Sequence, residues 1–356
     1  MSKSQEQTDT SKSTPNLFNI KTREGDFLEL DDFSIFEVKG FQHPPNCVIA
    51  YPRYIPNKFG DRIRNNVRYH KIYTLKEKNT VLRNLYSDLY MKDPFFSKII
   101  PSVPINKIRK FFQPQDTLSS LSSEKKLVGL RKKSVNLAEI ISSRSGIHVA
   151  KFGLSGSIMV NLDQSNSDID LIIYGSAESQ KISKTVQELM VEGTQICRHS
   201  GDNLNALYNF RSKDSKIGYH QFINTEKRKS NQGIFDGTEF FIRYLKEWSE
   251  VNELYGANSY NPVGYGLVSA TIQDDVNSLF TPCIYDIEDV TVISGSPKWD
   301  IRHVISYRGR FAEQAKKSEK VKIQGRVEQV QTKGESYYQL ILGESPEDFL
   351  IPISYE

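Results

Sequence analysis

The chain has 356 residues, 38% of them hydrophobic, and its 47 Lys and Arg exceed its 43 Asp and Glu by four. This length predicts two or three domains, and the apolar share suffices for ordinary cores, which excludes a wholly disordered protein. The net charge of +4 favours anionic partners only weakly. No run approaches the roughly 18 apolar residues of a membrane helix, and the polar start lacks the apolar core of a secretory signal. We therefore expect a cytoplasmic protein without membrane contact.

The residue pattern of the N-terminal part changes twice. Residues 1–16 are rich in Ser, Thr and Gln without periodic apolar residues, and they predict a flexible tail. Short β-type runs at 33–38 and 47–51, separated by Pro and Gly, predict strands. The pattern becomes helical from about 75 to 110. We therefore expect residues 17–115 to form a region that is first β-rich and then helical.

The middle of the chain, residues 116–255, alternates helical and β-type segments. A helical pattern is followed by a strand, a Gly/Ser turn, a second strand and an amphipathic helix, at about 123–143, 147–152, 153–157, 169–174 and 182–190 respectively. Another strand is expected at 237–245. This order is typical of the core of an α+β domain with a mixed sheet.

The C-terminal part, residues 256–356, is β-rich. Val321 and Ile323 alternate with polar residues, Lys333-Gly334 predicts a turn, and 337–342 predicts the returning strand. We expect a small β domain or barrel, which makes the whole chain α+β.

The cysteines and histidines do not predict a disulfide or a zinc site. Cys47, Cys197 and Cys283 are odd in number and far apart, so we expect three buried thiols. The six histidines show no metal-ligand spacing.

Two acids one residue apart mark the most informative passage. Asp168 and Asp170 lie in an apolar β-type run, and side chains on a strand repeat with period two, so both project from the same face. Carboxylate oxygens are the ligands that Mg²⁺ prefers, and two such ions can hold both oxygens of a phosphoryl displacement. The pair therefore predicts a Mg²⁺ site, with Mn²⁺ as a substitute ion.

A Gly-Ser turn precedes these acids. Gly156 and Ser157 follow a β-type run that ends near Phe152. Glycine allows close backbone approach to a phosphate, and backbone N–H groups with a serine hydroxyl can bind polyphosphate oxygens. The turn therefore predicts a triphosphate site next to the metal site.

Gly-Ser followed, ten residues later, by an Asp-apolar-Asp-apolar strand resembles the signature of the DNA polymerase beta-like nucleotidyltransferase superfamily. More loosely, the whole chain resembles uncharacterised predicted archaeal nucleotidyltransferases. Ser155 departs from the pattern, because the family usually has an apolar residue there. The resemblance implies a polymerase beta-like core and a nucleotide-binding enzyme.

The family also uses a third carboxylate, on a neighbouring strand. Glu239 is the only acid of the strand expected at 237–245, and Asp236, just before it, is the alternative. By this resemblance Asp168, Asp170 and Glu239 would bind the metal ions. Gly156 and Ser157 would anchor the β and γ phosphates while an acceptor hydroxyl attacks the α-phosphorus.

Two other functions stay open. Family members with a degenerate third acid can lose catalysis, so the chain could be a silent nucleotide- or RNA-binding protein. Other members modify a small molecule or a protein. The sequence does not identify the base of the NTP, the acceptor or the oligomeric state.

Basic residues concentrate in three segments, which could contact RNA or DNA as an acceptor. They are residues 53–71, interleaved with aromatics, residues 211–229 and residues 302–326. Arginines contact phosphates and aromatic rings stack on bases. The alternative for each segment is a solvated charged surface.

Overall fold

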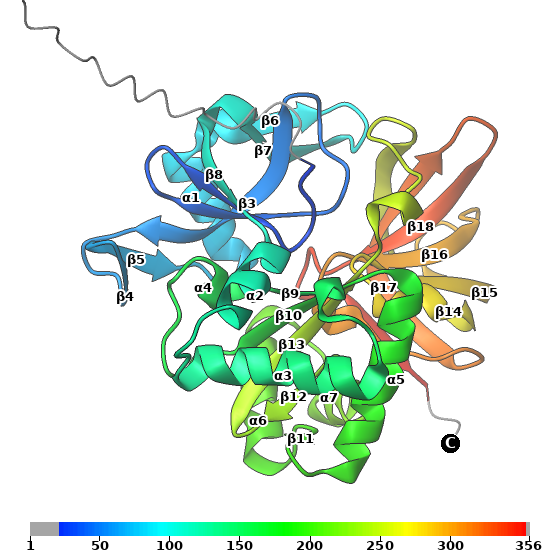
Figure 1. The fold of residues 1–356 in the computed structure, drawn as a ribbon. Coiled ribbons are helices and arrows are strands. Elements are labelled where there is room, and N and C mark those ends of the chain that lie inside the picture. Colours follow the sequence, from blue (N-terminus) through cyan, green and yellow to red (C-terminus); the bar gives the residue numbers. More distant parts are fainter. Residues whose placement is uncertain (1–20, 354–356) are drawn as a thin grey trace, which may run out of the picture.

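The computed structural model describes residues 21–353, and three sheets follow one another along this part of the chain (Figure 1). The protein is α+β, as expected from the sequence. The tail expected at 1–16 lies outside the described residues. Among the residues described, no helix combines the length and the apolar character needed to cross a bilayer.

The first sheet has eight strands, in the order β4-β5-β3-β2-β1-β8, with β7 beside β3 and β6 beside β7. Its strands are β1 (Phe27–Leu30), β2 (Ile35–Val38), β3 (Cys47–Pro56), β4 (Arg62–Arg64), β5 (Val67–Lys71), β6 (Tyr90–Asp93), β7 (Lys98–Pro104) and β8 (Ile108–Phe112). The helix α1 (Leu75–Leu85) packs Leu82 into the core of this sheet.

The helical expectation for 75–110 is wrong beyond the end of α1. Strands β6 to β8 occupy residues 90–112. Pro101 and Pro104 lack the N–H that a helix needs, and β-branched Ile99, Ile100 and Val103 favour a strand. The sequence reading also missed the helix at 114–122, which begins at a proline, a position where the missing N–H costs nothing.

The second sheet has five strands in the order β11-β12-β13-β10-β9. Its elements are α2 (Pro114–Ser122), α3 (Gly129–Ser145), β9 (Phe152–Leu154), α4 (Gly156–Met159), β10 (Ile169–Tyr174), α5 (Ser176–Glu192), β11 (Ile196–Cys197), α6 (Gly201–Arg211), α7 (Tyr219–Glu226), β12 (Gln232–Phe235) and β13 (Thr238–Leu245). Strand β10 lies parallel to β13 and antiparallel to β9. The strands expected at 169–174 and 237–245 are confirmed as β10 and β13, whereas the one expected at 147–152 begins only at Phe152, after a short 3-10 helix, and β11 and β12 were not expected.

The two faces of the second sheet have different neighbours. Ile169 and Leu171 of β10 and Ile242 of β13 point into the core formed with α3 and α5. On the other face, Ile172 lies against the first sheet's leading segment, where a Cβ on Gly25 would lie 3.0 Å from its Cδ1. Figure 1 shows β10 and β13 between the first sheet and helix α3.

The third sheet is a closed barrel. It contains β14 (Ser259–Asp274), β15 (Cys283–Ser294), β16 (Ile301–Ser306), β17 (Lys320–Gln331), β18 (Ser336–Leu342) and β19 (Phe349–Pro352). Five strands follow the order β14-β15-β16-β18-β17, and β17 returns to pair with β14, while β19 adds to the edge of β17. The hairpin between β17 and β18 turns at Lys333-Gly334, as expected. This small Greek-key barrel is of the OB-fold type.

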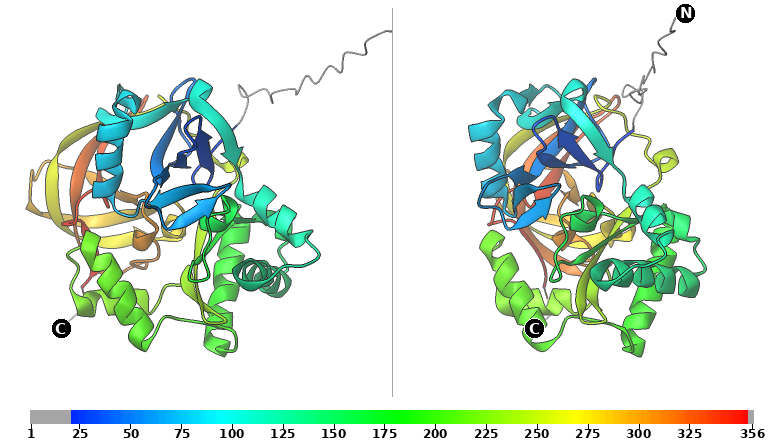
Figure 2. Two further views of the ribbon diagram at one scale, coloured as in Figure 1. Left: turned by 90° about the vertical axis from the view of Figure 1, so that its left-hand side faces the viewer. Right: turned by 60° about the vertical axis from the view of Figure 1, so that its left-hand side comes forward.

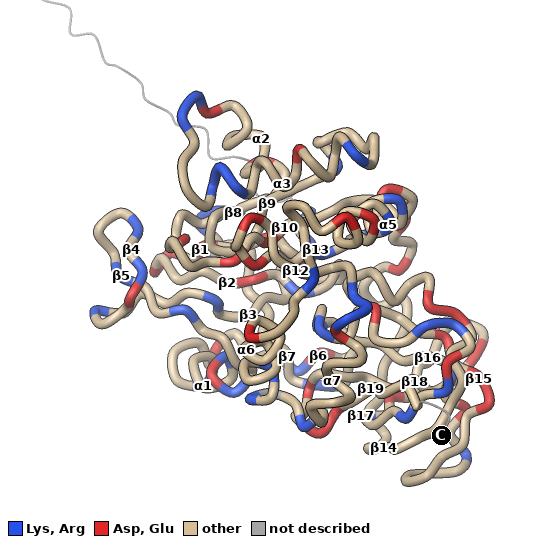
Figure 3. The backbone as a smooth tube through the Cα atoms, turned by 90° about the horizontal axis from the view of Figure 1, so that it is seen from below, with Lys and Arg blue, Asp and Glu red and all other residues tan. Residues whose placement is uncertain are grey.

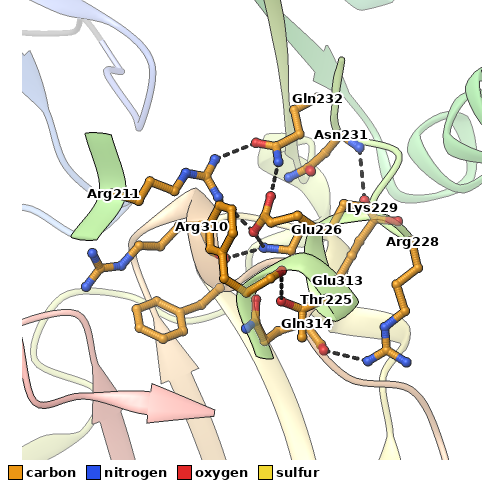
Figure 4. Close-up of polar contacts among 12 residues, drawn as sticks. Arg211, Thr225, Glu226, Arg228, Lys229, Asn231, Gln232, Arg310, Glu313 and Gln314 are labelled. Atoms are coloured by element: carbon orange, nitrogen blue, oxygen red, sulfur yellow. Dashed lines mark hydrogen bonds and ion pairs between the residues drawn. The ribbon is translucent and has the colours of Figure 1, made fainter. Parts of the chain in front are cut away.

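A buried polar network joins α7 to the barrel (Figure 4). Lys229, 1% exposed, donates from Nζ to Glu226 at 2.7 Å, and Arg211 donates to the same carboxylate at 2.9 Å. The Glu313 carboxylate accepts from the backbone N–H groups of Ser230 and Asn231. Figure 2 shows α6 and α7 beside the barrel. These paired charges are structural, because buried ions need partners.

The expectation of three buried thiols is correct for one. Cys283 is buried in the barrel, Cys47 is half-buried, and Cys197 is exposed. Cys197 lies on β11, the two-residue edge strand of the second sheet, where one side of the chain faces solvent.

Candidate functional site

The three acids singled out from the sequence lie at neighbouring strand starts. Asp168 immediately precedes β10, Asp170 is the second residue of β10, and Glu239 is the second residue of β13. The parallel register pairs Ile169 with Phe240, which sets Glu239 level with Asp168. Since Ile169 and Phe240 point into the helical core, alternation places all three acids on the opposite face.

The Gly-Ser turn lies against the second aspartate. Ser155 N–H donates to the Asp170 carbonyl at 2.9 Å, and Gly156 has a φ of +66°. A Cβ at Gly156 would lie 2.0 Å from Asp170 Oδ2. Only glycine therefore fits both the backbone conformation and the closeness of the carboxylate. The Ser157 side-chain oxygen is buried and has no hydrogen-bond partner among residues 21–353.

The unexpected serine before this turn also has a partner. Ser155 is buried, and its Oγ donates to the Gly25 carbonyl at 2.7 Å. An apolar residue at this position would leave that carbonyl without its bond. Ser155 thus ties the Gly-Ser turn to the segment leading into the first sheet.

The acids repel one another. Burial and the neighbouring Asp168 charge raise the pKa of Asp170 to about 7. Burial and the same Asp168 charge also raise the pKa of Glu239. Carboxylates whose pKa values rise in this way lack sufficient positive charge, and a bound cation would supply it.

Cations of the first sheet act on the acids of the second sheet. The electrostatic interactions of Asp170 include Lys71 of β5 and Arg53 of β3, both of which lower its pKa. Burial and the adjacent Arg53 charge lower the pKa of Lys71 to about 8, although Asp168 and Asp170 raise it. At neutral pH Lys71 is therefore still mostly protonated, and the site holds charges of both signs.

A β-bulge places Arg53. Opposite β3, Ile35 pairs with Tyr54 while Phe36 pairs with Pro52, so Arg53 is the extra residue between them. Bulges redirect side chains and are common beside active sites. Arg53 and its neighbour Tyr54 both interact electrostatically with the two aspartates, and Arg53 interacts more strongly still with Glu37.

The loop between α4 and Asp168 is held by arginines from two other elements. Arg62 of β4 donates to the Leu162 carbonyl, and Arg131 of α3 forms an ion pair with Asp163 at 2.7 Å. Inside the loop, Gln164 N–H donates to Ser167 Oγ at 3.0 Å. The position of Asp168 is thus fixed by long-range contacts rather than by its own strand alone.

The site offers hard oxygen donors but no preformed cluster of three ligands. Within residues 21–353, no three His, Cys, Asp or Glu side chains gather as a metal-binding group. Asp168 and Asp170 have the chemistry that Mg²⁺ or Mn²⁺ requires. Glu239 is exposed, so its side chain is free to approach an ion held by the aspartates.

The alternative third acid points elsewhere. Asp236 has a φ of +46° in the turn between β12 and β13, and its side chain is 67% exposed. It lies 3.6 Å from Lys133 of α3, on the helical side of the sheet. Position therefore favours Glu239 over Asp236.

The basic segments turn out to differ from one another. In the segment 53–71, Arg62 binds the loop before Asp168, and Arg64 binds Glu29. Arg53 and Lys71 instead act on the acids of the site. Figure 3 shows the Lys and Arg of the β4–β5 hairpin at the rim of the molecule. Sequence reasoning did not single out Arg53 or Lys71, and the bulge that aims Arg53 leaves no signal in the sequence.

The other two basic segments are largely ion-paired. In the segment 211–229, Arg211 and Lys229 bind Glu226. In the segment 302–326, Arg302 pairs with Asp300 at 2.9 Å, and Arg326 binds Glu344. A role of these segments in binding nucleic acid stays a prediction.

Fold and site define an α+β protein whose central sheet carries a carboxylate pair facing cations of a separate β sheet. Over 339 residues the chain is 29% identical to the "Uncharacterized protein MJ1086" of Methanocaldococcus jannaschii, and the match covers 93% of this chain and 98% of that protein. No protein-family model matches the chain. No solved structure matches it either. The similarity thus extends along nearly the whole of an uncharacterised archaeal protein.

Proposed function

We propose that the protein is a Mg²⁺-dependent nucleotidyltransferase that transfers NMP from an NTP to an acceptor. The observation that supports this most is the position of Asp168, Asp170 and Glu239 on one face of two adjacent parallel strands. The Gly156 turn directly beside Asp170 is the second support. On this proposal, the central sheet is a polymerase beta-like core.

Each residue has a distinct role in this proposal. Asp168 and Asp170 hold the metal, and Glu239 completes the site near the acceptor hydroxyl. The backbone at Gly156 and the Ser157 hydroxyl, which is buried without a partner in the described part of the chain, bind phosphate oxygens. Magnesium, when bound, supplies charge stabilisation at the α-phosphate and at the departing pyrophosphate.

One observation favours a second function, a catalytically silent nucleotide- or RNA-binding protein on the same fold. Glu239 does not gather with the aspartates into a three-ligand group among the described side chains. A protein with only two metal ligands could bind Mg²⁺ and NTP without activating an acceptor.

Labelled NTPs test the proposal. Purified protein is incubated with each NTP in turn, labelled at the α-phosphate, together with Mg²⁺ or Mn²⁺ and with RNA, DNA, protein or small-molecule fractions. Label in one fraction identifies the acceptor class and supports an enzyme. NTP binding without label in any fraction would support the silent binding protein.

Glu239→Gln separates the candidate third acids. We expect it to lower kcat about 100-fold, because the amide that replaces the carboxylate near the acceptor hydroxyl can neither complete the metal site nor accept a proton. Asp236→Asn is the matched control and should leave kcat unchanged, since Asp236 lies on the helical side. Steady-state kinetics check both, and equal losses in the two variants would contradict the assignment of Glu239.

A further inference from the structure

Two cations of the first sheet line the acid site without belonging to its predicted metal ligands. Arg53 stands on the bulge of β3, and Lys71 is the last residue of β5. The pairing of Tyr54 with Lys71 places these cations on adjacent strands. Both interact electrostatically with Asp168 and Asp170 across the boundary between the two sheets.

Lys71 is poorly satisfied by the protein. The residue is only 7% exposed, yet no described residue accepts a hydrogen bond from its ammonium group or forms an ion pair with it within 4.0 Å. Its nearest aromatic partner is the Tyr73 ring, 5.0 Å from Nζ. Burying an ammonium group without acceptors is costly, so this position suits an anionic ligand.

Other polar atoms on the elements that carry the site also lack partners. Arg53 Nε, the Tyr54 hydroxyl and Ser157 Oγ are buried without a hydrogen bond among the described residues. Each buried donor that lacks a partner calls for an explanation, and a bound anion supplies one. A ligand rich in acceptor oxygens would satisfy all of them.

A third nearby cation is already engaged. Arg243 of β13 also acts on Asp170, but it forms an ion pair with Glu24 and lies 3.6 Å from Glu37. Its charge is therefore balanced by carboxylates of the first sheet. Arg53 feels the Glu37 charge more strongly than those of the aspartates, but among the described residues it has no ion pair within 4.0 Å and donates to the Ile72 carbonyl at 3.1 Å, so Lys71 and Arg53 can both turn donors to a ligand.

We infer that Lys71 and Arg53 form a polyphosphate clamp, which binds the β and γ phosphates while the Gly156 turn binds them from the other side. This inference rests on the proposed function and extends it, because it assigns the first sheet a direct part in substrate binding. The metal at Asp168 and Asp170 would face the α-phosphate. The clamp would recognise the phosphate chain and not the base.

Binding of inorganic tripolyphosphate in the presence of Mg²⁺, measured by calorimetry, tests the clamp without requiring catalysis. Lys71→Met keeps an unbranched side chain, one heavy atom shorter, and removes its charge, and we expect the affinity for tripolyphosphate and for NTP to fall at least tenfold. Lys71→Arg should keep most of the affinity. Lys92→Met, at an exposed lysine of β6, is the matched control and should bind like the wild type. Thermal melting confirms that each variant is folded.

The outcomes separate the clamp from the enzyme assignment. If the wild type transfers no NMP yet binds tripolyphosphate and Lys71→Met does not, the clamp stands and the nucleotidyltransferase proposal fails. If the wild type transfers NMP while Lys71→Met and Lys92→Met bind tripolyphosphate equally well, the clamp is wrong. Failure of the folded wild type to bind tripolyphosphate would also overturn the clamp.

Discussion

Asp170→Asn is expected to abolish Mg²⁺-dependent nucleotide transfer and, at the same time, to stabilise the metal-free protein. Activity falls because an amide cannot replace a carboxylate as a Mg²⁺ ligand. Stability rises because burial and the Asp168 charge raise the pKa of Asp170 to about 7. The folded state therefore holds a proton that the unfolded chain releases above its normal pKa, and stability is lost as the pH rises from about 4 to 7.

The measurements are transfer of labelled NMP and the Tm at pH 7.5 without metal. We expect the Tm of Asp170→Asn to rise by roughly 2 °C or more, and its dependence on pH between 4 and 7 to flatten. Asp31→Asn, an exposed aspartate with no ion pair among the described contacts, is the control and should change neither quantity. An Asp170→Asn protein with full activity would refute the metal assignment.

Gly156→Ala is expected to reduce transfer about 100-fold or more, because displacement of reacting groups by about 1 Å has effects of this size. The added Cβ would lie 2.0 Å from Asp170 Oδ2, so the carboxylate or the turn must move. The φ of +66° adds a conformational cost of about 1 kcal/mol.

Gly193→Ala is a matched control for this substitution. Gly193 has the same φ of +66°, at the end of α5, but the nearest atom to its added Cβ is 3.9 Å away. Both variants should lose stability from backbone strain in denaturant titrations, Gly156→Ala at least as much because of the added clash, and only Gly156→Ala should lose activity. Equal activity in the two would mean that the Gly156 turn and Asp170 do not act together.

The local part of the site could be predicted from sequence. The period of a strand is a property of neighbouring residues, so the spacing of Asp168 and Asp170 is enough to predict that they share a face. The strand that carries Glu239 is likewise evident from its β-branched and aromatic residues. The parallel register that sets Glu239 level with Asp168 depends on how two distant strands pair, and the structure supplies it.

The first sheet's contribution could not be predicted. In sequence, Arg53, Arg62 and Lys71 look alike, since all are basic residues among aromatics. Their roles diverge because a bulge redirects Arg53, Arg62 binds a loop, and Lys71 lies buried beside the acids. These differences come from tertiary contacts that a single sequence does not encode in any local pattern.

The long-range anchor of the Asp168 loop bears on the modularity of the protein. Arg62 and Leu162, which it binds, stand 100 residues apart. A fragment that starts near residue 116 would contain every predicted metal ligand but would lack the arginine that holds their loop. Any unit that is transplanted, expressed alone or exchanged between relatives must therefore keep the first sheet together with the acidic strand, and the two are expected to evolve together.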